Sequence, residues 1–245
     1  MGRLDLTSYP ERIRRIESEY RKKSALDIGF AEVDRLPEAG NALGVLSLPN
    51  CVARIVIRKG LSSAQRFQAI CHEMLHLDLT LKGYPSLQPL SNDHNAKNLA
   101  AHLESLLQHR LIMPIEQREF LYDPYVIERN VAESLCRQFI QLTDFGSPTD
   151  PLWQFLYSCW AVSYARVTIL AVDSTAFRKL SEFFKKPEMK PAIEIARGLH
   201  RLIQQSDLTD PRKYTALLHT ILDSHIQANV INATKRIQVG DPCFP

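Results

Sequence analysis

Short β-type runs in this chain lie only in the first 60 residues, and helical periodicity fills most of the remaining sequence. The runs Leu26–Val33, Ala42–Leu48 and Val52–Arg58 are rich in apolar residues and are bounded by turn residues, which predicts three strands. In Val52–Arg58, one face carries Ala53, Ile55 and Ile57 and the other Arg54, Val56 and Arg58, a pattern typical of a half-buried strand near the edge of a sheet. We therefore predict an α+β fold, with a small antiparallel sheet followed by an all-helical C-terminal half.

Helix signals surround and follow these runs. Ser62 or Ser63 caps the first helix after the strands, and Met113-Pro114 should end the next one. The segment Tyr84–Asp93 between them contains two prolines and polar turn residues, so it predicts a loop. The helices expected are Pro10–Ala25, about Ser63–Lys82, about Asn95–Arg110, Tyr125–Leu142, Pro151–Val172, Thr175–Phe184, Pro191–Gln205 and Arg212–Ala228.

The chain is long enough for one large domain or two modest ones. It has 245 residues, of which 45% are hydrophobic, and its nine Gly and fourteen Pro are too few for a low-complexity chain. Gly146–Pro151 is rich in turn residues and is the best candidate linker. We therefore predict a domain over residues 1–145 and a helical region over 146–245, which is either a second domain or part of the first.

Charge and cysteine content exclude several classes of partner. The 30 basic and 27 acidic residues are intermixed, which argues against nucleic-acid binding. No run of eighteen apolar residues and no signal-like N-terminus is present, so we expect no membrane contact and a cytoplasmic protein. Without a C-x-x-C pair, the cysteines predict neither a disulfide framework nor a cysteine zinc site, and favour a reducing compartment. They are Cys51, Cys71, Cys136, Cys159 and Cys243.

One segment carries a metal-binding spacing, His72-Glu73-x-x-His76. Residues four apart on a helix have Cβ atoms about 5–6 Å apart, so both imidazoles can reach one ion at about 2.0–2.1 Å. Glu73 projects about a quarter turn away, beside the place where a water on the metal would lie. A carboxylate there can take the proton of a water whose pKa the metal lowers. The motif thus predicts two zinc ligands and a general base.

The alternative for these histidines is burial in an ordinary core. His72 and His76 share a side of the predicted helix that differs from its apolar stripe, so core packing explains them less well. The residues beside them are uncharged, with the exception of Asp78, where an apolar residue is usual. The apolar stripe consists of Phe67, Ile70, Met74, Leu77 and Leu81.

With this motif the chain resembles the zincin peptidases, and specifically the gluzincin-like group. The resemblance covers roughly Val52–Pro114 as an edge strand, the motif helix, a loop and a second helix, and does not extend to the C-terminal half. It implies that His72, His76 and a third residue bind Zn²⁺, and that Glu73 is the general base of peptide hydrolysis. The longer metzincin pattern is absent, because Lys82 stands where that pattern needs a histidine.

The third zinc ligand is expected on the second helix of this segment. Gluzincins use a glutamate from a helix downstream of the motif, and Glu104 is the acidic residue that this helix offers after its start. Three histidines on the same helix remain open as ligands or supporting residues: His94, His102 and His109. The acidic residue that the family carries one turn later is missing, because Gln108 stands there.

These observations predict a zinc-dependent hydrolase, most specifically a metallopeptidase that acts on a peptide or protein substrate. Such enzymes commonly bind the substrate as an added strand, and Val52–Arg58 would be the edge that receives it. One alternative is a non-catalytic zinc-binding helical protein with a regulatory or interaction role. Another is a helical scaffold in which the spacing is coincidental. The substrate, the oligomeric state and the role of the helical half stay open.

Overall fold

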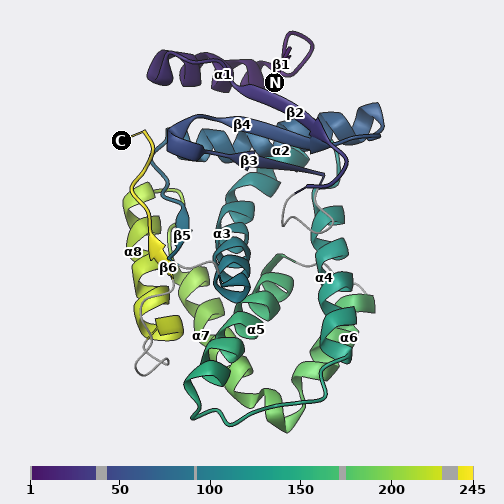
Figure 1. Ribbon diagram of the computed structural model, residues 1–245, viewed down its shortest axis with the longest axis vertical. Coiled ribbons are helices and arrows are strands. Elements are labelled where there is room, and N and C mark those ends of the chain that lie inside the picture. The colour runs from purple at the N-terminus through teal and green to yellow at the C-terminus, as the bar shows by residue number, and fades with distance from the viewer. Residues whose placement is uncertain (1, 37–42, 91–92, 171–174, 228–236, 245) are drawn as a thin grey trace. The chain divides into compact units, whose positions relative to one another are not determined.

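The structure is a computed structural model that describes residues 2–36, 43–90, 93–170, 175–227 and 237–244 (Figure 1). Within these residues it contains eight α-helices, one four-stranded sheet and one two-stranded sheet. The predicted α+β class is therefore confirmed. No helix among the described residues is both long and apolar enough to cross a bilayer.

Contacts within the chain divide it into two compact units. The first unit consists of Met1–Tyr84, Ile112–Pro124 and Pro242–Pro245. The second unit consists of Pro85–Leu111 and Tyr125–Asp241. The predicted boundary between residues 145 and 146 stays a prediction, since these units describe contacts rather than independent folding.

The first unit contains the four-stranded sheet, in the order β1-β2-β4-β3. Its strands are β1 (Gly2–Arg3), β2 (Gly29–Val33), β3 (Gly44–Ser47) and β4 (Arg54–Arg58). The prediction of an antiparallel sheet is wrong in one pair, because β2 and β4 run parallel. The reason is topological: β3 runs antiparallel to β4, so the chain has reversed direction twice by the time β4 pairs with β2 on its other side.

The predicted edge position of the third strand is also wrong. β4 lies between β2 and β3, and β3 is the outer strand among the described residues. The alternation in the sequence is real, because Ile55 and Ile57 are buried whereas Arg54 and Arg58 are exposed. The alternation indicates only that one face of the strand is covered. This is equally true of an interior strand with one solvated face.

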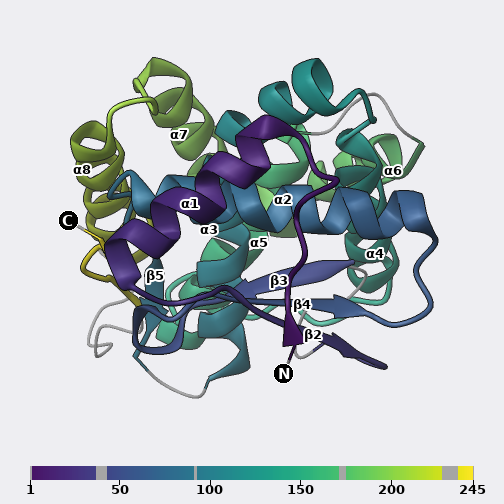
Figure 2. The same ribbon diagram turned by 90° about the horizontal axis from the view of Figure 1, so that it is seen from above.

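Two helices complete the first unit, α1 (Glu11–Ser24) and α2 (Ser63–Leu81). α2 packs against β3, β4 and α1, and Figure 2 shows α1 crossing α2 obliquely. Ser62 caps α2 as predicted: its hydroxyl accepts the Gln65 N–H, and the Gln65 side chain accepts the Ser62 N–H. This capping box fixes where the helix begins, and hence the turn on which the motif lies.

The second unit is almost entirely helical. Its helices are α3 (His94–Ile115, of which residues to Leu111 belong here), α4 (Tyr125–Ile140), α5 (Pro151–Leu170), α6 (Thr175–Phe184), α7 (Lys190–Gln205) and α8 (Pro211–Ile221). α5 packs on α7, and α4 packs on α6. These elements agree with the predicted helices, except that the last one is α-helical only to Ile221 and continues as a π-helical segment, Leu222–Gln227. The predicted ends at Val172 and Ala228 lie outside the described residues.

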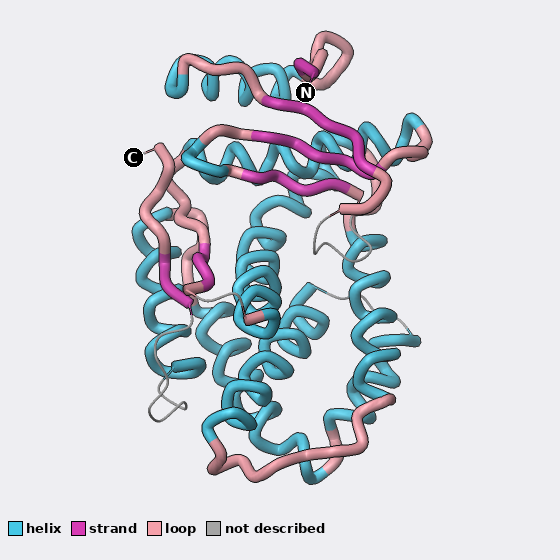
Figure 3. The backbone as a smooth tube through the Cα atoms, viewed as in Figure 1, coloured by secondary structure: helices cyan, strands magenta, loops and turns pink. Residues whose placement is uncertain are grey.

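Two local predictions need correction. Pro114 lies inside α3 instead of ending it, and the chain continues into a wider π-helical turn, Glu116–Phe120. The predicted loop Tyr84–Asp93 contains a strand, β5 (Leu87–Pro89), which pairs with β6 (Ile237–Val239) (Figure 3). The partner strand is so far away in the sequence that local composition could not reveal the pairing.

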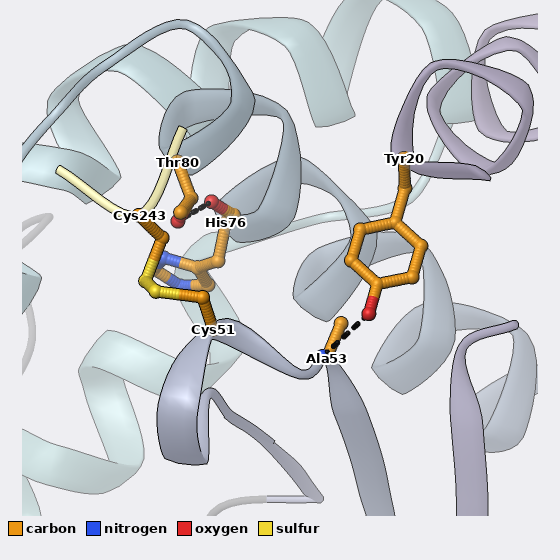
Figure 4. The surroundings of a disulfide bond; sticks show 6 residues. All are labelled: Tyr20, Cys51, Ala53, His76, Thr80 and Cys243. Carbon is orange, nitrogen blue, oxygen red and sulfur yellow. Dashed lines mark hydrogen bonds between the residues drawn. A yellow bond between two sulfur atoms is a disulfide. The ribbon is translucent and has the colours of Figure 1, made fainter. Parts of the chain in front are cut away.

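The cysteines depart from the sequence prediction as well. Cys51 and Cys243 form a disulfide between residues 192 positions apart, with Cα atoms separated by 5.3 Å (Figure 4). Nothing in their spacing indicates that the C-terminal segment returns to the first unit. The disulfide removes the basis for expecting a reducing compartment. Three cysteines lie outside this disulfide as thiols: Cys71, Cys136 and Cys159.

Candidate metal centre

The two motif histidines converge on one point. On α2, His72 Nε2 and His76 Nε2 lie 3.2 Å apart. Two nitrogens that each bind a tetrahedral ion at about 2.0–2.1 Å would be separated by about 3.3–3.4 Å. The imidazole pair therefore fits the ligand spacing of a zinc ion without rearrangement of α2.

A buried carboxylate orients the first of these histidines. Glu116, in the π-helical turn, is 1% exposed, and its Oε1 lies 2.8 Å from His72 Nδ1. Because an ionised carboxylate only accepts hydrogen bonds, His72 donates through Nδ1–H and turns the lone pair of Nε2 toward His76. The Tyr122 hydroxyl donates to the same carboxylate oxygen. This carboxylate–histidine arrangement is typical of metal-ligating imidazoles.

Sequence reasoning missed Glu116. It lies 44 residues from His72, beyond a proline that predicted the end of the helix. The π-helical turn after Pro114 places it, and such turns often occur at functional sites. No local pattern in the sequence distinguishes this glutamate from its neighbour Glu119, which pairs with Arg12 instead.

The motif glutamate is held against the outer strand of the sheet. Glu73 is 7% exposed, and its Oε2 accepts the N–H of Leu46 in β3 at 2.7 Å. Glu73 Cγ lies within van der Waals reach of Gly44, 3.4 Å from where a Cβ on this glycine would be. Burial raises the pKa of Glu73 and the charge of Glu116 acts in the same direction, whereas His72 and the Leu46 N–H lower it. A carboxylate with increased proton affinity thus lies beside the imidazole pair.

Two further side chains near the motif have structural explanations. Asp78, which is unusual for the motif, is buried and pairs with Lys82 at 2.7 Å and with Arg12 at 3.7 Å. Burial raises the pKa of the Cys71 thiol to about 12, so Cys71 stays protonated at neutral pH. A neutral thiol is a poor metal ligand and a poor nucleophile.

The remaining predicted site residues lie on the part of α3 that belongs to the second unit. Glu104 accepts the Leu87 N–H at 3.4 Å and the Gln108 side-chain amide at 3.0 Å. Enclosure by the protein raises the pKa of Glu104 to about 7, because these two hydrogen bonds only partly offset its desolvation. His94 is exposed and lies 2.9 Å from the side-chain amide of Asn98.

The other two histidines of α3 belong to a hydrogen-bonded network in the second unit. His109 Nδ1 lies 2.7 Å from Glu128 Oε1, and Arg166 donates to both oxygens of Glu128 at 2.8 and 2.9 Å. Burial alone would raise the pKa of Glu128, but Arg166 and His109 hold it well below its usual range. Arg166 also donates to His102 Nδ1 at 3.1 Å. Burial and this positive charge lower the pKa of His102 to about 3.

The second unit therefore contains a carboxylate–histidine pair, His109–Glu128, of the same kind as His72–Glu116 in the first. Sequence reasoning missed Glu128 and Arg166, which come from α4 and α5. A run of helical residues gives no signal of which buried carboxylate a distant histidine will meet.

Within the first unit the structure brings together His72, Glu73 and His76, the three residues of the motif. Glu104 belongs to the second unit, so its part in the ligand set stays a prediction. Comparison of the chain with protein-family models, with curated proteins and with solved structures finds no match.

Proposed function

We propose that this protein is a zinc-dependent metallopeptidase with a zincin-like catalytic helix. The observation that carries the proposal is the pair of Nε2 atoms 3.2 Å apart on α2, with one imidazole oriented by the buried Glu116. Glu73 follows His72 directly on the same helix. A hydrolytic zinc site needs three protein ligands, a residue that orients them and an adjacent base. This helix and Glu116 supply two of the ligands, the orienting carboxylate and the base.

Each residue has a defined part in the reaction. When bound, zinc supplies positive charge that lowers the pKa of a water and polarises the substrate carbonyl. Glu73 accepts the proton of that water and then delivers it to the leaving nitrogen, and its raised pKa suits both transfers. Glu116 keeps His72 in the ligating tautomer throughout.

The third ligand in this proposal comes from α3, and the chemistry of the second unit favours His109 over Glu104. Glu104 already accepts two hydrogen bonds, and a carboxyl with a pKa of about 7 is partly protonated at neutral pH. His109 carries a carboxylate on Nδ1, as zinc-binding histidines generally do. A three-histidine set would depart from the gluzincin pattern that the sequence resembles.

The substrate is proposed to bind as an extended peptide along β3. Among the described residues β3 pairs only with β4, so its other side is the edge that the prediction had assigned to β4. The edge lies next to Glu73, because the Leu46 N–H is bonded to that carboxylate. Main-chain hydrogen bonds to such an edge give affinity for a peptide and do not require a particular side chain in it.

The decisive experiment is the Glu73→Gln variant. The amide keeps the shape and can still accept the Leu46 N–H, but it cannot take a proton from water. We expect zinc binding to stay within about threefold of the parent, and hydrolysis of a fluorogenic peptide library to fall by at least about 10²-fold. Glu119→Gln, the same change at a glutamate that pairs with Arg12, is the matched control and should keep full activity.

One contact supports a second candidate function, and the same variant tests it. The hydrogen bond from Leu46 to Glu73 gives this carboxylate a structural task, joining α2 to β3. This contact favours a non-catalytic protein in which zinc stabilises the fold. That function is supported if the parent binds zinc but hydrolyses no peptide, and if Glu73→Gln lowers thermal stability with zinc affinity unchanged.

A further inference from the structure

The turn that presents Cys51 has an unusual backbone. Asn50 and Cys51 have φ values of 51° and 60°, so two successive residues that are not glycine adopt the left-handed conformation. Asparagine tolerates this conformation, but cysteine does so only where the surroundings impose it. The disulfide to Cys243 is one such constraint. The disulfide thus helps to hold the turn in its left-handed backbone conformation.

The segment that carries Cys243 lies against the end of α2. The ring of Phe244 contacts Tyr20 edge-on, with centroids 5.9 Å apart, and its carbonyl oxygen lies 3.9 Å from where a Cβ on Gly83 would be. Gly83 follows the last turn of α2. The close-up of the disulfide includes His76 and Thr80 of α2 among its surroundings (Figure 4). The cross-link therefore fixes the C-terminal segment beside the half of α2 that carries a proposed zinc ligand.

We propose that the Cys51–Cys243 disulfide is a reversible latch, whose reduction releases the C-terminal segment and accelerates metal loss from the His72–His76 pair. Reduction by a dithiol breaks the S–S bond and forms two S–H groups. The dithiol supplies both electrons and both protons and leaves as a cyclic disulfide. The released segment then loses its covalent tie while the ring contact with Tyr20 remains, and the turn at Cys51 loses a constraint on its left-handed backbone.

The part of the proposal that concerns metal depends on the proposed zinc site, whereas release of the segment does not. The first measurement therefore uses the chelator-treated, metal-free full chain. A non-reducing peptide map should link Cys51 to Cys243. After dithiol treatment and anaerobic desalting, amide hydrogen exchange of the peptide spanning Leu77–Leu81 should be at least about tenfold faster. The Cys243→Ser variant should exchange rapidly without reduction.

The second measurement uses the zinc-loaded chain and follows the transfer of zinc to a chromogenic chelator. Reduced protein and Cys243→Ser should lose zinc about tenfold faster than oxidised protein. Cys159→Ser, which removes a thiol outside the disulfide, is the control and should respond to reduction like the parent. If Cys243→Ser does not fold, the reduced and reoxidised parent supplies the same comparison.

Each outcome decides one part of the proposal. A peptide map without the Cys51–Cys243 link, or unchanged exchange in Leu77–Leu81 after reduction, overturns the latch. Faster exchange with an unchanged rate of zinc loss refutes the coupling to the metal centre. A chain that binds no zinc ends the proposed function, and with it the coupling, while the exchange measurement still decides whether the segment is released.

Discussion

Glu116 provides the sharpest test of the metal centre, because no sequence motif predicts it. It contacts His72 Nδ1 at 2.8 Å and is 1% exposed, so its charge acts on the imidazole with little screening by water. The variant Glu116→Gln keeps the size of the side chain and an oxygen that can accept from both His72 and Tyr122. It removes the negative charge and leaves the hydrogen bonds in place.

The expected magnitude depends on the part a carboxylate plays behind a ligating histidine. Loss of such a partner costs about 10–100-fold in metal affinity, or about 1.4–2.7 kcal/mol. Charge-assisted hydrogen bonds are about twice as strong as neutral ones, so a variant that keeps a neutral acceptor should lie near the lower limit. We therefore expect about tenfold weaker zinc binding for Glu116→Gln and about 100-fold for Glu116→Leu, which removes the acceptor altogether.

Competition with a chromogenic chelator measures these affinities, and circular dichroism verifies the fold of each variant. Glu119→Gln is the matched control from the same π-helical turn, and its zinc affinity should equal that of the parent. Tyr122→Phe removes the second donor to the carboxylate and should weaken binding by less than about threefold. A folded Glu116→Gln protein that binds zinc within twofold of the parent would show that Glu116 does not support a ligand.

Three other predictions test separate parts of the structure. His109→Ala should release zinc whereas Glu104→Ala should retain it, as measured by zinc titration; the opposite result restores the gluzincin ligand set. His102 is neutral when folded, because its pKa is about 3 instead of the ordinary 6.5. The unfolded chain therefore binds the extra proton, and stability falls as the pH drops below 6.5. The metal-free parent should lose up to about 1.4 kcal/mol per pH unit more than His102→Gln in urea unfolding between pH 6.5 and 5, and equal slopes would contradict this. Gly44→Ala would place a Cβ 3.2 Å from Ile57 Cγ2, so it should lower the free energy of unfolding by about 1–3 kcal/mol, as measured by urea unfolding; an unchanged value would mean that the strand adapts.

The features that the sequence determined by itself are local. The serine cap and the helical period of α2 are properties of neighbouring residues, so they predicted where the helix begins and that His72 and His76 share one side of it. The α+β class and most helices come from similar local periodicities, which depend on positions two residues apart in strands and three or four apart in helices. The direction in which Glu73 projects from the helix is determined in the same way, because successive residues of a helix are rotated by a fixed angle about its axis.

The features that only the tertiary structure decided involve residues that are far apart in the sequence. The orienting carboxylate of His72, the partner of Cys51 and the interior position of β4 all depend on which distant segment packs against a given element. The sequence pattern of a strand records that one face is buried, but not how many strands lie beside it. The path of the backbone decides which histidine a buried glutamate contacts. Here a π-helical turn, which continues α3 past Pro114, places Glu116 beside His72. Such pairings are set by the packing of the whole unit, and the spacing of residues along the chain contains no record of them.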